Sequence, residues 1–218
     1  IHQQVRDGVR RIALVGATAA DARDVMIEGE SGLLSTARPL EMPTYEPSRR
    51  RLVWPNGSIA TTYSAEEPDR LRGPQHGSAW CDELAAWRYS GAWPMLLLGL
   101  RLGTKPRALV TTTPRPTMVV RELIAQPTTV VTRGSTYDNR ENLAPSFLDQ
   151  IIKRYEGTRL GRQELHAEIL EDVEGALWGM AQLDGLRVVE APELVRVVVA
   201  VDPAVSSHQL SDETGIVA

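Results

Sequence analysis

The sequence predicts an α/β fold built on a largely parallel sheet. Residues 11–16 (RIALVG) form a mostly apolar run of the kind that is buried in parallel sheets. Two later runs end at Asp82 and Thr113, and segments of helical spacing separate all three. A composition of 42% hydrophobic and 24% charged residues over 218 positions suits one large core and argues against a disordered chain.

Strands and helices are predicted in a regular order along the chain. Apolar and β-branched runs predict strands at residues 11–16, 52–54, 58–63, 78–81, 107–113, 128–132, 196–201 and 214–218. Helical spacing predicts helices at residues 1–9, 21–34, 65–71, 82–102, 117–125, 145–155 and 159–170. Asn56 and Gly57 lie between two of the strands and supply the positive backbone angles of a tight β-hairpin.

The chain is expected to contain one nearly complete domain and the start of a second. Residues 1–170 carry the α/β pattern, whereas residues 171–192 are acidic, contain glycine and resemble a linker. Residues 193–218 begin with a strand that runs into Asp202, and an antiparallel strand follows. We interpret the sequence as a fragment, because it begins without an initiator Met and stops inside a predicted strand.

Charge and cysteine content exclude several classes of protein. A formal net charge of −4 excludes a histone-like protein or a polybasic membrane binder, so contact with nucleic acid requires a local basic patch. Cys81 is the only cysteine, which excludes an internal disulfide and a cysteine-cluster zinc site and fits the reducing cytoplasm. The longest apolar stretch, residues 95–100, is far shorter than the ~20 residues of a spanning helix, so no membrane partner is expected.

The first candidate site is the strand that ends in Asp82 and Glu83. Ligands of parallel sheets sit in the crevice outside the carboxyl ends of the strands. In phosphate-transfer ATPases the first acid at such a position holds Mg²⁺, usually through water, and the second polarises the attacking water. Asp82 and Glu83 fit these roles, although two acids at a helix start also occur because they interact favourably with the helix dipole.

The next predicted strand ends in three hydroxyl residues, Thr111, Thr112 and Thr113. Short hydroxyl side chains beside an acidic strand can contact a γ-phosphate or its attacking water and sense its loss. Threonine is also favoured in strands for packing alone, so this motif is weak by itself.

Arginines supply a third set of candidates. Arg72, in Leu-Arg-Gly ahead of the acidic strand, can stabilise charge on a transferring phosphoryl group in its own subunit or a neighbour's. Arg49, Arg50 and Arg51 lie beside the predicted hairpin, where three cations can meet a phosphate backbone. A solvated surface position is the common outcome for an arginine and is the alternative for all four.

Asp202 and Asp212 form a fourth candidate site. Asp202 ends an apolar strand and Asp212 lies where the next strand begins, which is how two-metal nucleases start their carboxylate cluster. Two divalent cations need more than two carboxylates. The alternative is structural, with Asp202 ending a strand and Asp212 in a turn.

A phosphate-binding loop of the form G-x-x-x-x-G-K-[ST] does not occur in the sequence. Lys105 and Lys153 are the only lysines, and neither has that context. If the acidic pair is a Walker B element, the loop must precede Ile1, and residues 1–9 would form the end of its helix. We expect such a loop upstream of this chain.

Taken in order, these segments resemble the large terminase subunit of tailed double-stranded-DNA phages, the motor that packages the genome into a procapsid. The resemblance rests on RRIALVGATAADARDVMIEGESGLL, WPNGSIATTYSAEEPDRLRGPQHGSAWCDELAAW, ALVTTTPRP, GRQELHAEILEDVEGALW and VVAVDPAVSS. Terminases of prophages and gene-transfer agents look most alike. The resemblance implies a P-loop-type (ASCE) ATPase domain over residues 1–170 and the start of a ribonuclease-H-like nuclease domain over residues 193–218.

The resemblance also implies roles for the residues of the ATPase domain. Asp82 matches the Walker B acid that associates with Mg²⁺, and Glu83 matches the catalytic carboxylate that activates water. Arg72 aligns with the position proposed as an arginine finger that acts on a neighbouring subunit. The coupling motif of the family, which also meets the nucleotide, is matched by Thr111, Thr112 and Thr113.

For the nuclease domain, Asp202 matches the first metal-binding aspartate and Asp212 is a candidate second ligand. The implied cofactors are ATP and Mg²⁺, with Mn²⁺ as an alternative in the nuclease. The implied partners are double-stranded DNA, the portal protein, the small terminase subunit and further copies of the chain in a ring on the procapsid. The implied place of action is the cytoplasm of the bacterial host, and the subunit is not expected in the mature virion.

Two other interpretations are open at this point. A helicase-type ATPase shares the acidic strand, the polar strand and the arginine, but would continue after the linker into a second nucleotide-fold domain. The alternative from a different class is a structural prophage remnant without catalysis. Tight binding of ATP by a protein of this length would contradict that interpretation.

Overall fold

The computed structural model describes residues 1–169, 185–186, 196, 198–202 and 215–217. The chain divides into two compact units, Ile1–Glu174 and Gly175–Ala218, and each is described by itself. The predicted linker, residues 171–192, lies almost entirely outside the described residues.

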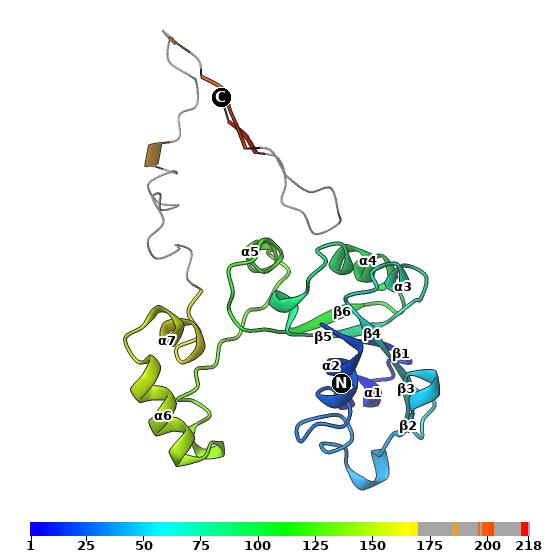
Figure 1. The fold of residues 1–218 in the computed structure, drawn as a ribbon. Coiled ribbons are helices and arrows are strands. Elements are labelled where there is room, and N and C mark those ends of the chain that lie inside the picture. The colour runs from blue at the N-terminus through cyan, green and yellow to red at the C-terminus, as the bar shows by residue number, and fades with distance from the viewer. Residues whose placement is uncertain (170–184, 187–195, 197, 203–214, 218) are drawn as a thin grey trace. The chain divides into compact units, whose positions relative to one another are not determined.

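A six-stranded sheet forms the centre of the first unit (Figure 1). Its strands are β1 (Arg11–Gly16), β2 (Thr44–Glu46), β3 (Arg51–Val53), β4 (Ile59–Ser64), β5 (Ser78–Asp82) and β6 (Arg107–Thr111). Their order across the sheet is β2-β3-β4-β1-β5-β6. β4, β1, β5 and β6 run parallel to one another, whereas β3 is antiparallel to both β2 and β4. The prediction of an α/β fold with a largely parallel sheet is therefore confirmed.

Helices occupy the connections between these strands. The α-helices are α1 (His2–Arg6), α2 (Ala19–Asp24), α3 (Asp69–Arg72), α4 (Ala92–Gly99), α5 (Met118–Ala125), α6 (Pro145–Tyr155) and α7 (Arg159–Glu164). Short 3-10 helices are η1 (Pro39–Glu41), η2 (Pro47–Arg49), η3 (Leu84–Ala86) and η4 (Arg140–Asn142). Among the described residues, no helix has the length and apolar composition that crossing a membrane would require.

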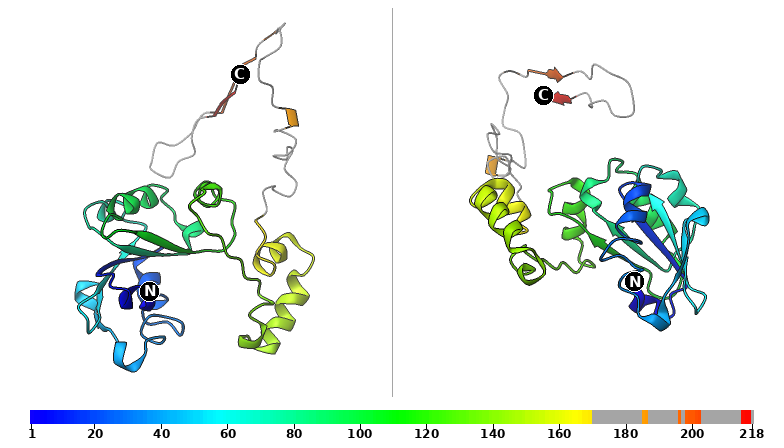
Figure 2. Two further views of the ribbon diagram at one scale, coloured as in Figure 1. Left: turned by 180° about the vertical axis from the view of Figure 1, so that it is seen from behind. Right: turned by 60° about the horizontal axis from the view of Figure 1, so that its bottom comes forward.

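The core has two layers, one on each face of the sheet (Figure 2). Side chains alternate along β1, so Ile12 and Leu14 join the cluster formed with α1 and α2. Ala13 and Val15 join the opposite cluster, which α3 and α4 complete. These four side chains are at most 1% exposed, and burial of each large aliphatic side chain contributes about 1.5–3 kcal/mol.

A sharp turn connects β1 to α2. A Cβ at Gly16 would lie 2.7 Å from the backbone N of Ala22, so only glycine permits this close approach. Oγ1 of Thr18 then accepts a hydrogen bond from the Asp21 N–H at 3.1 Å, and Oδ2 of Asp21 accepts one from the Thr18 N–H at 3.0 Å. This reciprocal capping box explains why α2 begins at Ala19.

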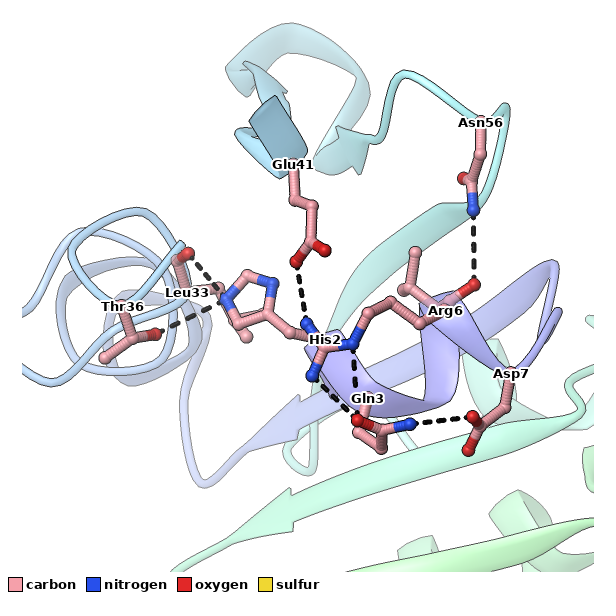
Figure 3. Close-up of polar contacts among 9 residues, drawn as sticks. His2, Gln3, Arg6, Asp7, Leu33, Thr36, Glu41 and Asn56 are labelled. Carbon is pink, nitrogen blue, oxygen red and sulfur yellow. Dashed lines mark hydrogen bonds and ion pairs between the residues drawn. The ribbon is translucent and has the colours of Figure 1, made fainter. Parts of the chain in front are cut away.

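Polar contacts hold α1 against the first unit (Figure 3). Nδ2 of Asn56 donates to the backbone O of Val5 at 3.1 Å, and Arg6 forms an ion pair of 2.7 Å with Glu41. His2 and these residues line a small cavity of ≈ 100 Å³. The cavity lies beside the hairpin turn that precedes β4, and thus at the amino end of that strand.

The second unit contains one described pair of strands. β7 (Ala200–Asp202) and β8 (Gly215–Val217) are antiparallel, with Asp202 opposite Gly215. The antiparallel pairing predicted for this part of the chain is confirmed for these residues.

The predicted helix at residues 21–34 is wrong beyond Asp24, where α2 ends. The chain continues as a series of tight turns. A Cβ at Gly29 would lie 2.6 Å from the backbone O of Val25, and one at Gly32 would lie 2.5 Å from the backbone O of Ile27. Glycine therefore allows a tighter path here than an α-helix, although the apolar residues of this segment still reach the core.

Other element boundaries also differ from the prediction. Residues 128–132 do not form a strand, and Val130 is 89% exposed, so no packing partner stabilises a strand there. α7 ends at Glu164, and Ala167 has a φ of 53°, which an α-helix does not allow. α3 begins at Asp69, because Pro68 fits only at a helix start. The helical region predicted at residues 82–102 divides into η3 and α4, and the short edge strand β2 has no counterpart in the prediction.

Candidate active site

The carboxyl ends of β5 and β6 lie side by side and bring the acidic and hydroxyl residues together. The two strands are parallel neighbours, with Asp82 opposite Thr111. Glu83 follows β5, whereas Thr112 and Thr113 follow β6, which ends two residues earlier than predicted. Hydrogen bonds connect the two groups, so the expected proximity of the acidic pair and the three threonines is confirmed.

The Asp82 carboxylate is bonded to the hydroxyl of Thr111. Oγ1 of Thr111 donates to Oδ1 of Asp82 at 2.5 Å, and Nε1 of Trp80 donates to the same Oγ1 at 3.0 Å. Ser78, Trp80 and Asp82 alternate along β5 and therefore project from one face of the sheet. Oγ of Ser78 donates to Oε1 of Gln4 in α1 at 2.5 Å. Asp82 thus lies on the face of the sheet that α1 covers.

Glu83 has an unusual backbone conformation. Its φ of 48° and ψ of 49° place it in the left-handed region, which costs a residue with a side chain roughly 1–2 kcal/mol. Oε1 of Glu83 accepts a hydrogen bond from the backbone N–H of Thr113 at 3.0 Å. Strained backbone persists where the surrounding structure holds it in place, and functional sites are a common location. The left-handed turn directs the Glu83 carboxylate to the end of β6.

Thr112 and Trp87 fix the backbone that follows the acidic pair. Oγ1 of Thr112 accepts a hydrogen bond from the Ala85 N–H at 2.9 Å. Nε1 of Trp87 donates to the backbone O of Asp82 at 3.0 Å. η3 is therefore tied to both strands, and the position of Glu83 does not depend on a free loop.

Cys81, next to the acidic pair, is not a candidate nucleophile. Its side chain is fully buried, and burial followed by the nearby charge of Asp82 raises the pKa of the thiol far above its usual range. A thiol that is not ionised is a poor nucleophile.

The structure does not bring Arg72 to the acidic pair. Arg72 is the last residue of α3, and its neighbour Leu71 packs against the end of α4, where a Cβ at Gly99 would lie 3.3 Å from the Leu71 backbone O. From there the chain returns to the beginning of β5, not to its end. Within the described part of the chain, Arg72 is exposed and makes no hydrogen bond or ion pair.

The predicted nuclease residues belong to the second unit. Asp202 ends β7, and the position of its backbone agrees with the predicted strand that runs into an aspartate. The side chain of Asp202 and all of Asp212 lie outside the described residues. Their roles as metal ligands remain predictions.

The edge formed by Asp82, Glu83 and the three threonines is rich in oxygen atoms. Mg²⁺ prefers oxygen ligands and is commonly held by one or two carboxylates together with waters and the phosphates of a substrate. In the residues that the structure describes, no three His, Cys, Asp or Glu side chains gather into a metal-binding group. The Asp82 carboxylate therefore suits a metal that arrives with a phosphorylated ligand, and does not suit a metal held by the protein alone.

Trp80 and Trp87 are members of the site that the sequence did not reveal. Trp80 orients the Thr111 hydroxyl, and Trp87 holds the backbone of Asp82. The period of two along β5 places Trp80 on the same face as Asp82 and could have identified it. No comparable signal exists for Trp87.

Comparison with known proteins agrees with this geometry. Residues 2–184 match the family model described as terminase large subunit, T4likevirus-type, N-terminal. No curated protein matches the chain. Among solved structures, the large terminase ATPase domain of Thermus phage P74-26 is 17% identical with a TM-score of 0.52, over 78% of this chain and 80% of that chain.

The large terminase of another thermophilic bacteriophage is similar in two complexes. The complex with ATP-γ-S is 11% identical with a TM-score of 0.61, over 77% of this chain and 42% of that chain. The complex with ADP is 14% identical with a TM-score of 0.59, over 78% of this chain and 44% of that chain. These likenesses establish the fold. Because the family model covers most of the sequence, the chain belongs to the family of T4likevirus-type large terminase subunits, in their N-terminal region.

Proposed function

We propose that this chain carries part of the ATP-hydrolysing site of a motor that packages phage DNA. The single observation that carries the proposal is the hydrogen-bonded placement of Asp82, Glu83 and Thr111 at the carboxyl edge of a parallel sheet. Ligands bind at this edge in α/β sheets. Membership of the large terminase family favours this function over a helicase-type ATPase.

Asp82 and Glu83 would divide the chemistry between them. Asp82 would hold Mg²⁺, directly or through water, with its carboxylate oriented by the hydroxyl of Thr111. When bound with ATP, the metal bridges phosphate oxygens and neutralises the charge that develops on them. Glu83 would accept a proton from the attacking water, and the hydrogen bond from Thr113 holds its carboxylate in place for this role.

The threonines would connect the chemistry to movement of the protein. Thr111 bonds to Asp82, Thr113 bonds to Glu83, and Thr112 bonds to the backbone after the pair. A change in charge at either acid on loss of the γ-phosphate would therefore reach the end of β6 directly. This arrangement supports the role of coupling motif.

Arg72 would act on the site of a neighbouring copy. In its own chain it lies near the beginning of β5, whereas the acidic pair lies at the end of that strand. An exposed guanidinium without a partner in the described residues can enter a neighbour's site and stabilise charge on the transferring phosphoryl group. A homo-oligomeric ring would provide such a neighbour.

The phosphate-binding loop is expected to precede Ile1. α1 covers the face of the sheet from which Asp82 projects, as the contact between Gln4 and Ser78 shows. A loop that leads into α1 would therefore approach the nucleotide from the same face as Asp82. The backbone N–H groups of such a loop cradle phosphates.

Replacement of Glu83 tests this function in the whole subunit. Glu83→Gln keeps the shape and the acceptor oxygen but removes the base, so we expect ATP turnover to fall by about 10²–10⁴-fold while ATP binding is retained. Glu30→Gln, at an exposed acid far along the sequence from the site, is the matched control and should keep normal turnover. Unchanged turnover in the Glu83 variant would disprove the assignment.

The second unit would begin the nuclease domain that cuts concatemeric DNA. Asp202 at the end of β7 would provide the first ligand for Mg²⁺ or Mn²⁺ and Asp212 a second, with the remaining ligands from later in the whole subunit. Asp202→Ala should abolish metal-dependent cleavage of plasmid DNA without reducing ATP turnover. Cleavage equal to that of the unmodified subunit would refute this role.

The partners follow from the motor function. Double-stranded DNA would be gripped through its phosphates without reading of bases, and the ring of subunits would work with the portal protein and the small terminase subunit on the procapsid. ATP hydrolysis in turn around the ring would drive translocation. The site geometry supports only the hydrolytic part of this scheme directly.

A further inference from the structure

The amino ends of the parallel strands carry a concentration of positive charge. Arg10 and Arg11 lie at the beginning of β1, Arg107 begins β6, and Arg101 and Lys105 lie in the segment that leads into β6. All five side chains are exposed. We call these five residues the amino-edge cluster. It lies at the opposite end of the strands from Asp82 and Glu83.

Backbone pairing places these residues close to one another. Ser78 of β5 lies opposite Arg107 on one side and opposite Ile12 on the other, so Arg11 and Arg107 flank the start of β5. Neighbouring strands are about 4.8 Å apart, which puts the backbones of these two arginines roughly 10 Å apart. The N–H of Arg101 donates to the backbone O of His76 at 3.0 Å, two residues before β5 begins.

The same segment is linked to Arg11 as well. The N–H of Gly77 donates to the backbone O of Arg11 at 2.8 Å. Arg11, Arg101 and Arg107 thus surround one short stretch of chain, residues 76–78. Because these residues are anchored on strands and on strand pairing, the cations are held on a rigid edge.

The cluster differs from the other arginines in its lack of acidic partners. Arg6, Arg23, Arg51 and Arg70 each form an ion pair with a nearby carboxylate. By contrast, the side chains of Arg11, Arg101, Lys105 and Arg107 make no hydrogen bond or ion pair with any described residue. Arg10 bonds only to the backbone O of Asn56.

Cations that the protein does not neutralise suit an anionic partner. The whole chain has a formal net charge of −4, so the positive charge of this edge is local and is not a property of the composition. Arginine binds phosphate oxygens through its planar fork of N–H groups. A nearly linear edge of several cations matches a repeating anion better than a single small one, because duplex DNA presents one negative charge per about 1.7 Å of its axis.

We propose that the amino-edge cluster is a contact surface for the phosphate backbone of double-stranded DNA. The inference rests on the proposed DNA-packaging function, but it concerns an edge of the sheet that takes no part in the hydrolysis site. The contacts go to phosphates and do not distinguish base sequences. An acidic surface on a second copy of the chain is the competing occupant, and the experiment below separates the two.

The test is the binding of a short fluorescent duplex of mixed sequence to the whole subunit at several salt concentrations. Arg11→Gln/Arg101→Gln/Arg107→Gln should lower affinity at low salt by at least about tenfold, and the dependence of log K on log salt should become shallower by roughly 2–3 units, about 0.9 for each lost phosphate contact. A duplex of different base sequence should give the same values. Single Arg101→Gln and Arg107→Gln variants, each expected to reduce the slope by about one unit, serve if the triple variant does not fold.

The matched control removes the same number of charges elsewhere. Arg23→Gln/Arg70→Gln/Arg162→Gln changes three arginines that are paired with acids, and it should bind DNA within about twofold of the unmodified protein, with the same slope. Equal losses in both triple variants would show a general charge effect and overturn the proposal.

Two further results would also overturn the proposal. One is unchanged DNA binding by the Arg11, Arg101 and Arg107 variant. The other is a change in its self-association, measured by sedimentation, without loss of DNA affinity, which would assign the edge to a second copy. The Glu83→Gln variant separates the two proposals, because loss of ATP turnover with normal DNA binding tests hydrolysis alone, whereas the basic edge is tested by DNA binding without nucleotide.

Discussion

The backbone N–H of Thr113 donates a hydrogen bond of 3.0 Å to Oε1 of Glu83. The bond joins the end of β6 to the residue that follows β5, across two strands that are far apart in sequence. It fixes the direction of the carboxylate that we propose as the base, and it makes the left-handed conformation of Glu83 part of the site.

The conformation of Glu83 predicts a stability difference between two truncations. Glu83→Gly and Glu83→Ala both remove the carboxylate, but only glycine adopts a φ of 48° without strain. We expect the glycine variant to be more stable than the alanine variant by about 1 kcal/mol. Denaturant unfolding of both variants measures the difference, and equal stability would show that the strain is not present in solution.

The Thr111 hydroxyl predicts a second effect. Thr111→Val keeps the shape but removes the hydrogen bond to Asp82 and the acceptor for the Trp80 indole. We expect a loss of about 1 kcal/mol in the free energy of unfolding and a lower rate of ATP hydrolysis. Thr111→Ser retains the hydroxyl and should restore most of both quantities. A valine variant with full activity would remove Thr111 from the site.

His76 predicts a dependence of stability on pH. It is 3% exposed, its Nε2 has no partner among the described residues, and burial lowers its pKa to about 4 from 6.5. The unfolded chain therefore binds a proton before the folded one as pH falls, so this contribution to stability is complete above about pH 6.5 and is lost toward about pH 4. Between about pH 7 and pH 5.5 we expect a loss of about 1 kcal/mol.

The control for this prediction is His76→Leu, which removes the titrating group and should weaken the pH dependence in that window. Chemical denaturation at each pH gives the comparison. If the two proteins lose stability in parallel, His76 is not the group responsible.

Cys81 predicts slow reaction with thiol reagents. Its side chain is fully buried, and burial raises the pKa of the thiol. We expect an aromatic disulfide reagent to modify the thiol only when the protein unfolds, so the rate should rise steeply across the denaturation transition. Rapid modification of the native protein would mean that the core next to Asp82 opens readily.

The site was predictable to the extent that it follows from strand order. Parallel strands that follow one another often become neighbours, and their carboxyl ends then meet, so the proximity of Asp82 and Thr111 follows from the apolar runs. The left-handed turn at Glu83 was not predictable, because nothing in Asp-Glu-Leu requires a positive φ. The bond between Trp80 and Thr111 depends on the register of β5 and β6, which sequence alone does not supply.

The errors in the fold also have physical causes. Helical spacing at residues 21–34 arises because Met26, Ile27 and Leu33 all reach the core, but they do so from tight turns. The backbone N–H of Leu33 donates to the O of Met26 at 2.9 Å, a contact that no regular helix contains. The β-branched residues at 128–132 have strand propensity without a neighbouring strand, and propensity alone does not form a sheet.

The central claim is that the ends of β5 and β6 form the hydrolytic side of an ATP site. The most direct measurement is a crystal structure of the whole subunit with ATP-γ-S and Mg²⁺. The account predicts the metal beside Asp82, bound directly or through one water, and the γ-phosphate within reach of a water held by Glu83. A nucleotide bound elsewhere, with Asp82 and Glu83 facing bulk solvent, would contradict it.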